Sequence, residues 1–183
     1  MHDRRFNPQN FTRLRSPERR ALLEVDRVVN LAIEDGRAKT ALDIGSGSGM
    51  FAELLAEQGL KVEGVDVSPE MVAVAQEFAP GVTFRQAVAE QLPYPDGSFD
   101  LVFMGVVLHE TDDALAALKE ARRVVLQRVA ILEWRDEEQP FGPPRSDRIP
   151  AEKMNSLAQQ AGFAQIEAIR LQNLVLYRLT PGN

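Results

Sequence analysis

Residues 41–49 read Ala-Leu-Asp-Ile-Gly-Ser-Gly-Ser-Gly, and this stretch decides the fold. The apolar run over 40–44 predicts a buried strand, and the glycines after it predict a tight turn into a helix over 50–58. Glycines let the backbone approach a ligand closely, and the start of the following helix offers free N–H groups. The stretch therefore predicts a ligand site where the first strand ends.

The spacing of the glycines discriminates between ligands. A dinucleotide fingerprint needs glycine or alanine at position 50, where this chain has Met50, and there is no Lys-Ser/Thr pair for a P-loop. Asp43 lies two residues before the first glycine and can orient the loop amides. A carboxylate there repels pyrophosphate but attracts the amino group and the sulfonium of S-adenosylmethionine. We therefore predict S-adenosylmethionine as the ligand.

Strand and helix patterns alternate along the rest of the chain. Further strands are expected over 61–67, 82–85, 99–104 and 128–133, and helices over 112–125 and 150–161. Two last strands, 165–171 and 174–180, flank a tight turn at Gln172-Asn173. The pattern predicts an α/β fold with helices on both faces of a mostly parallel seven-stranded sheet, which ends in an antiparallel hairpin.

The N-terminal segment is expected to form one helix over 13–31, with Ser16 as its N-cap and Pro17 in the first turn. Six arginines lie in the first twenty residues against Asp3 and Glu18, although the whole chain has a net charge of −6. A basic arm can bind phosphate or nucleic acid, but docking on the chain's own acidic body is the favoured interpretation.

Length and composition predict one domain, 1–183, because 183 residues with 44% hydrophobic content suit a single core. We divide it into an arm and helix (1–39), a cofactor-binding core (40–133), and a loop, helix and hairpin (134–183). The absence of cysteine excludes disulfides and cysteine-ligated metals, and no metal site is predicted. No apolar run is long enough for a membrane span and no secretory signal is seen, so a cytoplasmic location is expected.

Asp66 ends the second predicted strand, 23 residues after Asp43. An acid at this place accepts hydrogen bonds from both hydroxyls of a ribose, whereas capping of the helix after Ser68-Pro69 is the alternative. Val67 and Met71 then offer apolar surface for an adenine ring.

Several motifs, in this order, resemble the class I S-adenosylmethionine-dependent methyltransferases. They are Asp43-x-Gly-x-Gly-x-Gly49, Gly64-Val-Asp66-x-Ser-x-x-Met71, Ala-Glu-x-Leu-Pro-Tyr-Pro-Asp-Gly-Ser-Phe-Asp over 89–100, and Ala161-Gly-Phe163. His109-Glu110 and Gly142-Pro-Pro144 are typical of small stand-alone bacterial members of the ubiquinone/menaquinone C-methyltransferase-like branch. The resemblance covers nearly the whole chain and implies a three-layer Rossmann-like methyltransferase fold.

The resemblance also implies roles for individual residues. Asp43, Gly45, Ser46 and Gly47 would hold the methionine part of S-adenosylmethionine, Asp66 its ribose, and Val67 and Met71 its adenine. The main chain at Ala89 would meet the adenine edge, and Gly105 would lie close to the reacting sulfonium.

Val88 departs from the family pattern. Members often place Asp or Asn before the Ala-Glu pair, where it accepts from the adenine amino group. With Val88 that contact falls to backbone, water or Glu90. Losing one such hydrogen bond costs on the order of 1 kcal/mol.

His109 and Glu110 are the candidate acid–base pair. Methyl transfer is an in-line displacement that chiefly needs alignment, but the acceptor must also lose a proton, and histidine can take it. The alternative is that His109 only hydrogen-bonds the start of the next helix. Glu133 and Trp134 are expected on the pocket side, with Trp134 packing a flat acceptor or closing the core. The arm and the loop 134–149 are available to cover the site.

The predicted function is methyl transfer from S-adenosylmethionine to a small or medium organic acceptor, with S-adenosylhomocysteine as product. One alternative is methylation of RNA or protein docked by the arginine-rich arm, and another is a non-catalytic S-adenosylmethionine-binding protein. The chain lacks the Asn/Asp-Pro-Pro-aromatic motif of amino-group methylation and a cysteine for cytosine methylation. We therefore expect a small-molecule acceptor, no nucleic acid partner, and a monomer or homodimer.

Overall fold

The computed structural model describes residues 11–34 and 36–182 of the chain. Its centre is a seven-stranded sheet with the strand order β3-β2-β1-β4-β5-β7-β6. Strands β1 to β5 are parallel, and β7 runs antiparallel to both β5 and β6. The strands are β1 (Thr40–Ile44), β2 (Lys61–Asp66), β3 (Thr83–Gln86), β4 (Phe99–Gly105), β5 (Val125–Trp134), β6 (Phe163–Arg170) and β7 (Leu174–Pro181). The predicted sheet and its closing hairpin are confirmed.

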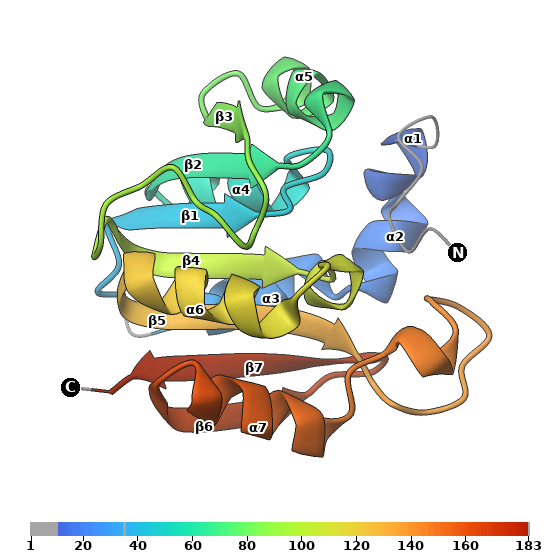
Figure 1. Cartoon of the computed structure of the whole chain (residues 1–183). Helices are drawn as coiled ribbons and strands as arrows, with labels where there is room; N and C mark the ends of the chain where they lie inside the picture. Colours follow the sequence, from blue (N-terminus) through green and yellow to red (C-terminus); the bar gives the residue numbers. More distant parts are fainter. Residues whose placement is uncertain (1–10, 35, 183) are drawn as a thin grey trace.

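Helices cover both faces of the sheet, as Figure 1 shows. Side chains alternate along β4: Leu101 and Phe103 pack with α3 (Val25–Ala32) and α4 (Met50–Glu57). Val102 and Met104 point the other way and pack with α6 (Ala114–Val124) and α7 (Ala151–Gln160). This period of two in a central strand produces the predicted three layers.

Local sequence signals fix where several elements begin. The Ser68 hydroxyl accepts a hydrogen bond from the backbone N–H of Met71 at 3.2 Å and so caps α5 (Pro69–Phe78). Asp113 caps α6 in the same way. At the C-terminal turn, the N–H of Leu171 donates to the carbonyl of Leu174 at 3.0 Å and closes the hairpin.

The prediction of one helix over 13–31 is wrong. The segment forms three short helices, α1 (Phe11–Leu14), α2 (Pro17–Leu22) and α3, with Ser16 capping α2 as predicted. Glu24 breaks the run with a left-handed backbone at φ 49°. Its carboxylate accepts from the backbone N–H of Gln172 at 2.6 Å, so the break is held by a contact with the distant C-terminal hairpin.

The basic arm docks through Arg15. This side chain is ion-paired with Glu53 on α4 and donates to the carbonyl of Ser48 at 3.0 Å. Its guanidinium also lies 4.7 Å from the ring centre of Phe78. Figure 1 places α1 and α2 beyond the end of the sheet toward which the parallel strands point. Arg15 thus follows the favoured interpretation of the arm, whereas Arg4 and Arg5 lie outside the described residues.

Within the described ranges, no helix is both long and apolar enough to cross a membrane.

Candidate active site

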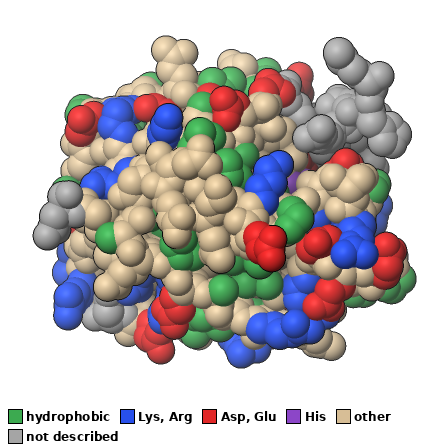
Figure 2. Space-filling model, turned by 60° about the horizontal axis from the view of Figure 1, so that its bottom comes forward, with side chains coloured by type: hydrophobic (Ala, Val, Ile, Leu, Met, Phe, Trp, Pro, Cys, Tyr) green, Lys and Arg blue, Asp and Glu red, His purple; other side chains and the backbone are tan. Residues whose placement is uncertain are grey.

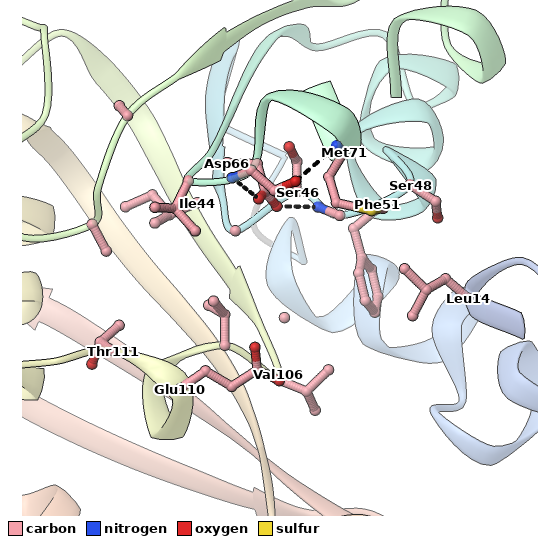
Figure 3. A pocket seen from close by; sticks show the side chains of 18 of the residues that line it. Leu14, Ile44, Ser46, Ser48, Phe51, Asp66, Met71, Val106, Glu110 and Thr111 are labelled. Atoms are coloured by element: carbon pink, nitrogen blue, oxygen red, sulfur yellow. Dashed lines mark hydrogen bonds between the residues drawn. The ribbon is translucent and has the colours of Figure 1, made fainter. Parts of the chain in front are cut away.

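A cavity of about 380 Å³ opens at the carboxyl ends of β1, β2 and β4. Figure 3 shows side chains from three sources around it: the glycine-rich turn, the segment after β4, and the N-terminal arm. In open sheets of this kind, ligands bind at this end of the strands. Most of the sequence-predicted site residues line it: Gly45, Ser46, Gly47, Asp66, Val67, Met71, Val88, Ala89, Glu90, Gly105 and Glu110.

The glycine-rich turn is held against β2. The N–H groups of Gly45 and Ser46 both donate to the carbonyl of Val65, at 2.8 and 3.0 Å. Gly45 has a φ of 69°, and a Cβ added there would lie 2.3 Å from Cγ2 of Val107. Only glycine fits this position, for both backbone and steric reasons.

Asp66 links β2 to the glycine-rich turn. Its Oδ2 accepts from the N–H of Gly47 at 2.8 Å and its Oδ1 from the N–H of Ser68 at 2.9 Å, as drawn in Figure 3. Burial raises the pKa of this carboxyl, while these amides and that of Val67 lower it. The capping contact at Ser68 is therefore present, and the same carboxylate also lines the cavity. Its contact with a ribose stays a prediction.

Asp43 is buried beside the turn and does not line the cavity. Its Oδ2 has no hydrogen-bond partner among residues 11–34 and 36–182. Burial and the nearby charge of Asp66 raise the pKa of Asp43 to about 8, although the N–H of Ala52 lowers it. A carboxyl with a bare buried oxygen is a group that gains from meeting a cation.

Two exposed valines lie on the cavity wall. Val67 and Val88 are 38% and 41% exposed, and they are two of only four exposed large hydrophobic residues in the described part of the chain. Met71 lines the same wall. Glu90 is engaged elsewhere, since its Oε1 accepts from the backbone N–H groups of Asp112 and Asp113 at 2.9 and 3.2 Å.

The segment after β4 is tightly constrained. A Cβ added to Gly105 would lie 2.8 Å from the ring of Phe51. Val106 follows with a φ of 54°, which is strained for a β-branched residue. Its N–H donates to the carbonyl of Leu132 at 2.8 Å, and this bond to β5 helps to hold the strained backbone on the cavity wall.

The predicted acid–base pair is divided between the cavity and the core. Glu110 lines the cavity, but His109 is only 7% exposed and does not line it. Nδ1 of His109 lies 2.8 Å from Oε2 of Glu133, and its backbone N–H donates to Oε1 of the same carboxylate at 3.2 Å. Its Nε2 is 3.8 Å from Oε1 of Glu110. Burial lowers the pKa of His109, but Glu133 and Glu110 raise it, and the net shift is upward.

Replacing Glu133 with glutamine is expected to lower the pKa of His109, because burial remains while its ionic partner is lost. A raised histidine pKa stabilises the fold below about pH 6.5, and this stabilisation is lost as the pH rises through the folded-state pKa. The variant should therefore lose about 1–3 kcal/mol of unfolding free energy at pH 6 and less at pH 8.

An NMR titration measures this pKa directly, because the chain has only two histidines. Glu110→Gln is the matched control, and its effect on the pKa should be smaller because Glu110 lies farther from the ring. An unchanged His109 pKa in Glu133→Gln would contradict the assignment.

Trp134 belongs to the core and not to the cavity wall. It is 3% exposed, and the ring of Phe141 packs 6.1 Å away between centres. Arg148 holds the loop 135–149 together by donating to backbone carbonyls along it, those of Arg135, Glu137, Phe141 and Pro143. The loop does not line the cavity, so of the two covering segments that the sequence offered, only the arm contributes.

Three residues of the arm, Leu14, Arg19 and Leu23, line the cavity, although the sequence patterns assigned them no role in the site. The arm's position was the one available signal, since it was expected to cover the site. Which of its side chains face inward depends on the break at Glu24.

Residues 42–131 match the family model described as "Methyltransferase domain". The chain is 36% identical over 94 residues to a demethylmenaquinone methyltransferase of Chlorobaculum parvum, which covers 51% of this chain and 39% of that protein. It is 37% identical over 116 residues to the corresponding enzyme of Thermus thermophilus, covering 59% and 52%. The chain thus matches about half or less of these curated relatives.

Solved structures extend the likeness to the whole fold. A SAM-dependent methyltransferase from Aquifex aeolicus superposes with a TM-score of 0.80 and 26% identity, covering 96% of this chain and all of the other. A magnesium protoporphyrin IX methyltransferase from Synechocystis, crystallised with S-adenosylhomocysteine, shares the fold with a TM-score of 0.71 and 21% identity, covering 88% and 84%. In its sheet order, its glycine-rich turn and its likeness to these relatives, the chain is similar to the class I S-adenosylmethionine-dependent methyltransferases.

Proposed function

We propose that this protein transfers a methyl group from S-adenosylmethionine to a small or medium organic acceptor. The observation that carries the proposal is the cavity at the strand ends, where the glycine-rich turn, Asp66 and two exposed valines meet. The match of residues 42–131 to a methyltransferase domain supports it.

The residues around the cavity fit S-adenosylmethionine. The bare Oδ2 of Asp43, which is buried beside the glycine-rich turn and not on the cavity wall, would favour a cationic amino group bound at that turn. Asp66 offers a carboxylate for the ribose hydroxyls, and the exposed Val67 and Val88 offer apolar faces for a flat ring. When bound, S-adenosylmethionine supplies a methyl group already activated by its sulfonium.

The protein's own contribution is mainly to hold and orient the reactants. The constrained backbone at Gly105 and Val106 fixes one wall of the cavity, and Glu110, which also lines the cavity, would take the proton of the acceptor. His109 lies behind the wall, where Glu133 raises its pKa, and it acts through Glu110 and not by direct contact.

A small acceptor is favoured over a macromolecule. The curated relatives include demethylmenaquinone methyltransferases, which are named for a small-molecule acceptor. In the arm, Arg15 is ion-paired with Glu53 and Arg20 with Asp26, so these cations already have protein partners. On the face in Figure 2, basic and acidic side chains are interspersed and do not form one basic patch.

The first test is calorimetric binding of S-adenosylmethionine, S-adenosylhomocysteine and NAD. We expect both adenosyl compounds to bind and NAD not to bind, and NAD binding alone would refute the proposal. Transfer of labelled methyl groups into fractionated cell extract would then identify the acceptor. Binding without any transfer would favour the non-catalytic alternative.

Replacing Asp66 with alanine should weaken S-adenosylhomocysteine binding by about 10- to 100-fold, since hydrogen bonds to a charged group contribute about 1.5–3 kcal/mol. Asp66 also accepts hydrogen bonds from the backbone N–H groups of Gly47 and Ser68, so the alanine variant changes the local structure as well. Asp66→Asn is therefore measured as a second variant, because its amide keeps one acceptor oxygen but loses the charge. Calorimetry on both variants, with thermal unfolding as a check of the fold, measures the effect. Wild-type affinity in Asp66→Ala would refute the ribose role.

The one-domain division, the cytoplasmic location and the monomeric or homodimeric state stay predictions from the sequence.

A further inference from the structure

Arg19 is the only lysine or arginine among the described residues that line the cavity. It projects from α2, next to Leu14 and Leu23 of the same arm. Methyl transfer as proposed above assigns no role to the positive charge of Arg19, although this charge lines a cavity that would bind a charged ligand.

One nitrogen of the Arg19 guanidinium, the buried Nε, has no acceptor among the described residues. Its carbon Cζ lies 5.8 Å from the ring centre of Trp134, which provides a flat apolar support. The neighbouring Arg15 and Arg20 differ, because each is ion-paired with a carboxylate. Arg19 therefore stands out in the arm as a cation turned inward without an ion pair to a described carboxylate.

A buried Arg19 Nε without an acceptor destabilises the protein unless a ligand supplies the acceptor. Burial lowers the pKa of Arg19, and Arg13 lowers it further, while Glu110 across the cavity raises it. A buried N–H donor without a partner loses its hydration and gains no bond in return. A planar guanidinium supported on an aromatic ring is suited to a carboxylate, which accepts two parallel hydrogen bonds.

We propose that Arg19 forms a carboxylate-binding subsite of the cavity. The carboxylate comes either from the methionine end of S-adenosylmethionine or from the acceptor, and the two sources share the same chemistry. The inference rests on the proposed function for the first source. If the cofactor supplies the carboxylate, Arg19 would bind the carboxylate of its methionine end. Asp43, beside the glycine-rich turn, would then favour the amino group of the same end.

The test for the cofactor source is a thermodynamic cycle. S-adenosylhomocysteine is compared with its decarboxylated analogue, which keeps the adenosine and the amino group, in wild type and in Arg19→Met. If Arg19 binds this carboxylate, the variant loses about 10- to 100-fold in affinity for S-adenosylhomocysteine. Wild type should bind the analogue equally weakly, and Arg19→Met should not weaken that binding further.

The test for the acceptor source uses benzoate as the probe and benzamide as its neutral control, with and without saturating S-adenosylhomocysteine. If the acceptor brings the carboxylate, S-adenosylhomocysteine affinity is unchanged in Arg19→Met. Benzoate then binds wild type at least about tenfold more tightly than benzamide, and the variant loses that preference. Equal affinities of wild type and variant for every probe would overturn the proposal.

Two further variants keep the result interpretable. Arg20→Met on the same helix removes an exposed cation that is paired with Asp26, and it should leave all affinities unchanged. Arg19→Lys keeps the charge without the planar fork and should retain part of the carboxylate affinity, which keeps the test valid if Arg19→Met unfolds. If wild type binds no adenosyl compound, the proposed function fails, whereas the benzoate comparison still tests Arg19.

Discussion

Alanine at position 45 is expected to destabilise the protein by about 2–5 kcal/mol, from about 1–2 for a left-handed backbone and 1–3 for overpacking. The added methyl group would meet Val107, and Val107 cannot easily retreat because it follows the strained Val106. Methyl transfer should fall by about 100-fold even where the protein stays folded, since a shift near 1 Å in a site has that effect. Chemical denaturation and labelled methyl transfer measure the two effects.

Two other glycines serve as controls that separate the cost of the left-handed backbone from the cost of the contact with Val107. Gly59 also has a positive φ, 89°, but an added Cβ would have nothing within 4 Å. Gly59→Ala should therefore show the backbone cost alone. Gly81 has neither a positive φ nor a close neighbour, so Gly81→Ala should be nearly neutral. If Gly45→Ala cost no more than Gly59→Ala, the contact with Val107 would not constrain the turn.

Replacing Asp43 with asparagine should stabilise the ligand-free protein at alkaline pH and weaken S-adenosylhomocysteine binding. The folded-state pKa of Asp43 is raised to about 8 from an ordinary value near 3.8. Between these values the folded state holds a proton that the unfolded state has lost, so stability falls as the pH rises through this window. Each pKa unit corresponds to about 1.4 kcal/mol, so the effect at pH 9 is several kcal/mol. Asp43→Asn should remove this slope.

The same carboxyl predicts proton release on binding. If the cationic amino group of the ligand meets Oδ2 of Asp43, the charged form is favoured and the proton leaves. At pH 7 wild type should release up to one proton per S-adenosylhomocysteine bound, measured by calorimetry in buffers of different ionisation enthalpy. In Asp43→Asn this release should vanish and the affinity should fall by about 10- to 100-fold. Equal proton release in both proteins would exclude Asp43 as its source.

The sequence predicts the sheet well because its signals are local. Strands β1, β4 and β5 contain apolar runs, and Ser68 and Asp113 cap helices where such residues commonly do. Most of the cavity wall follows from this, because residues after parallel strands meet at one edge of a sheet.

The rest of the site depends on contacts between distant segments. No local pattern around Glu24 encodes its hydrogen bond with Gln172, so the three helices of the arm appeared as one. The sequence does not indicate the burial of His109 for the same reason, because its carboxylate partner, Glu133, lies on the distant strand β5. Arg19 could not be assigned to the cavity because its support, Trp134, is 115 positions farther along the chain.

The contacts between the arm and the hairpin also set an order of events during synthesis. The carboxylate of Glu24 accepts a hydrogen bond from Gln172, and the carbonyl of Leu22 accepts one from Asn173. These partners lie 148 and 151 residues later in the chain. At about 5–20 residues per second, roughly 7–30 s pass between the translation of the two segments. The contacts of Arg15 with α4 and with the glycine-rich turn can therefore form long before the contacts that hold the break at Glu24. The final geometry of the arm, including the break at Glu24, is therefore reached only after the hairpin has been made.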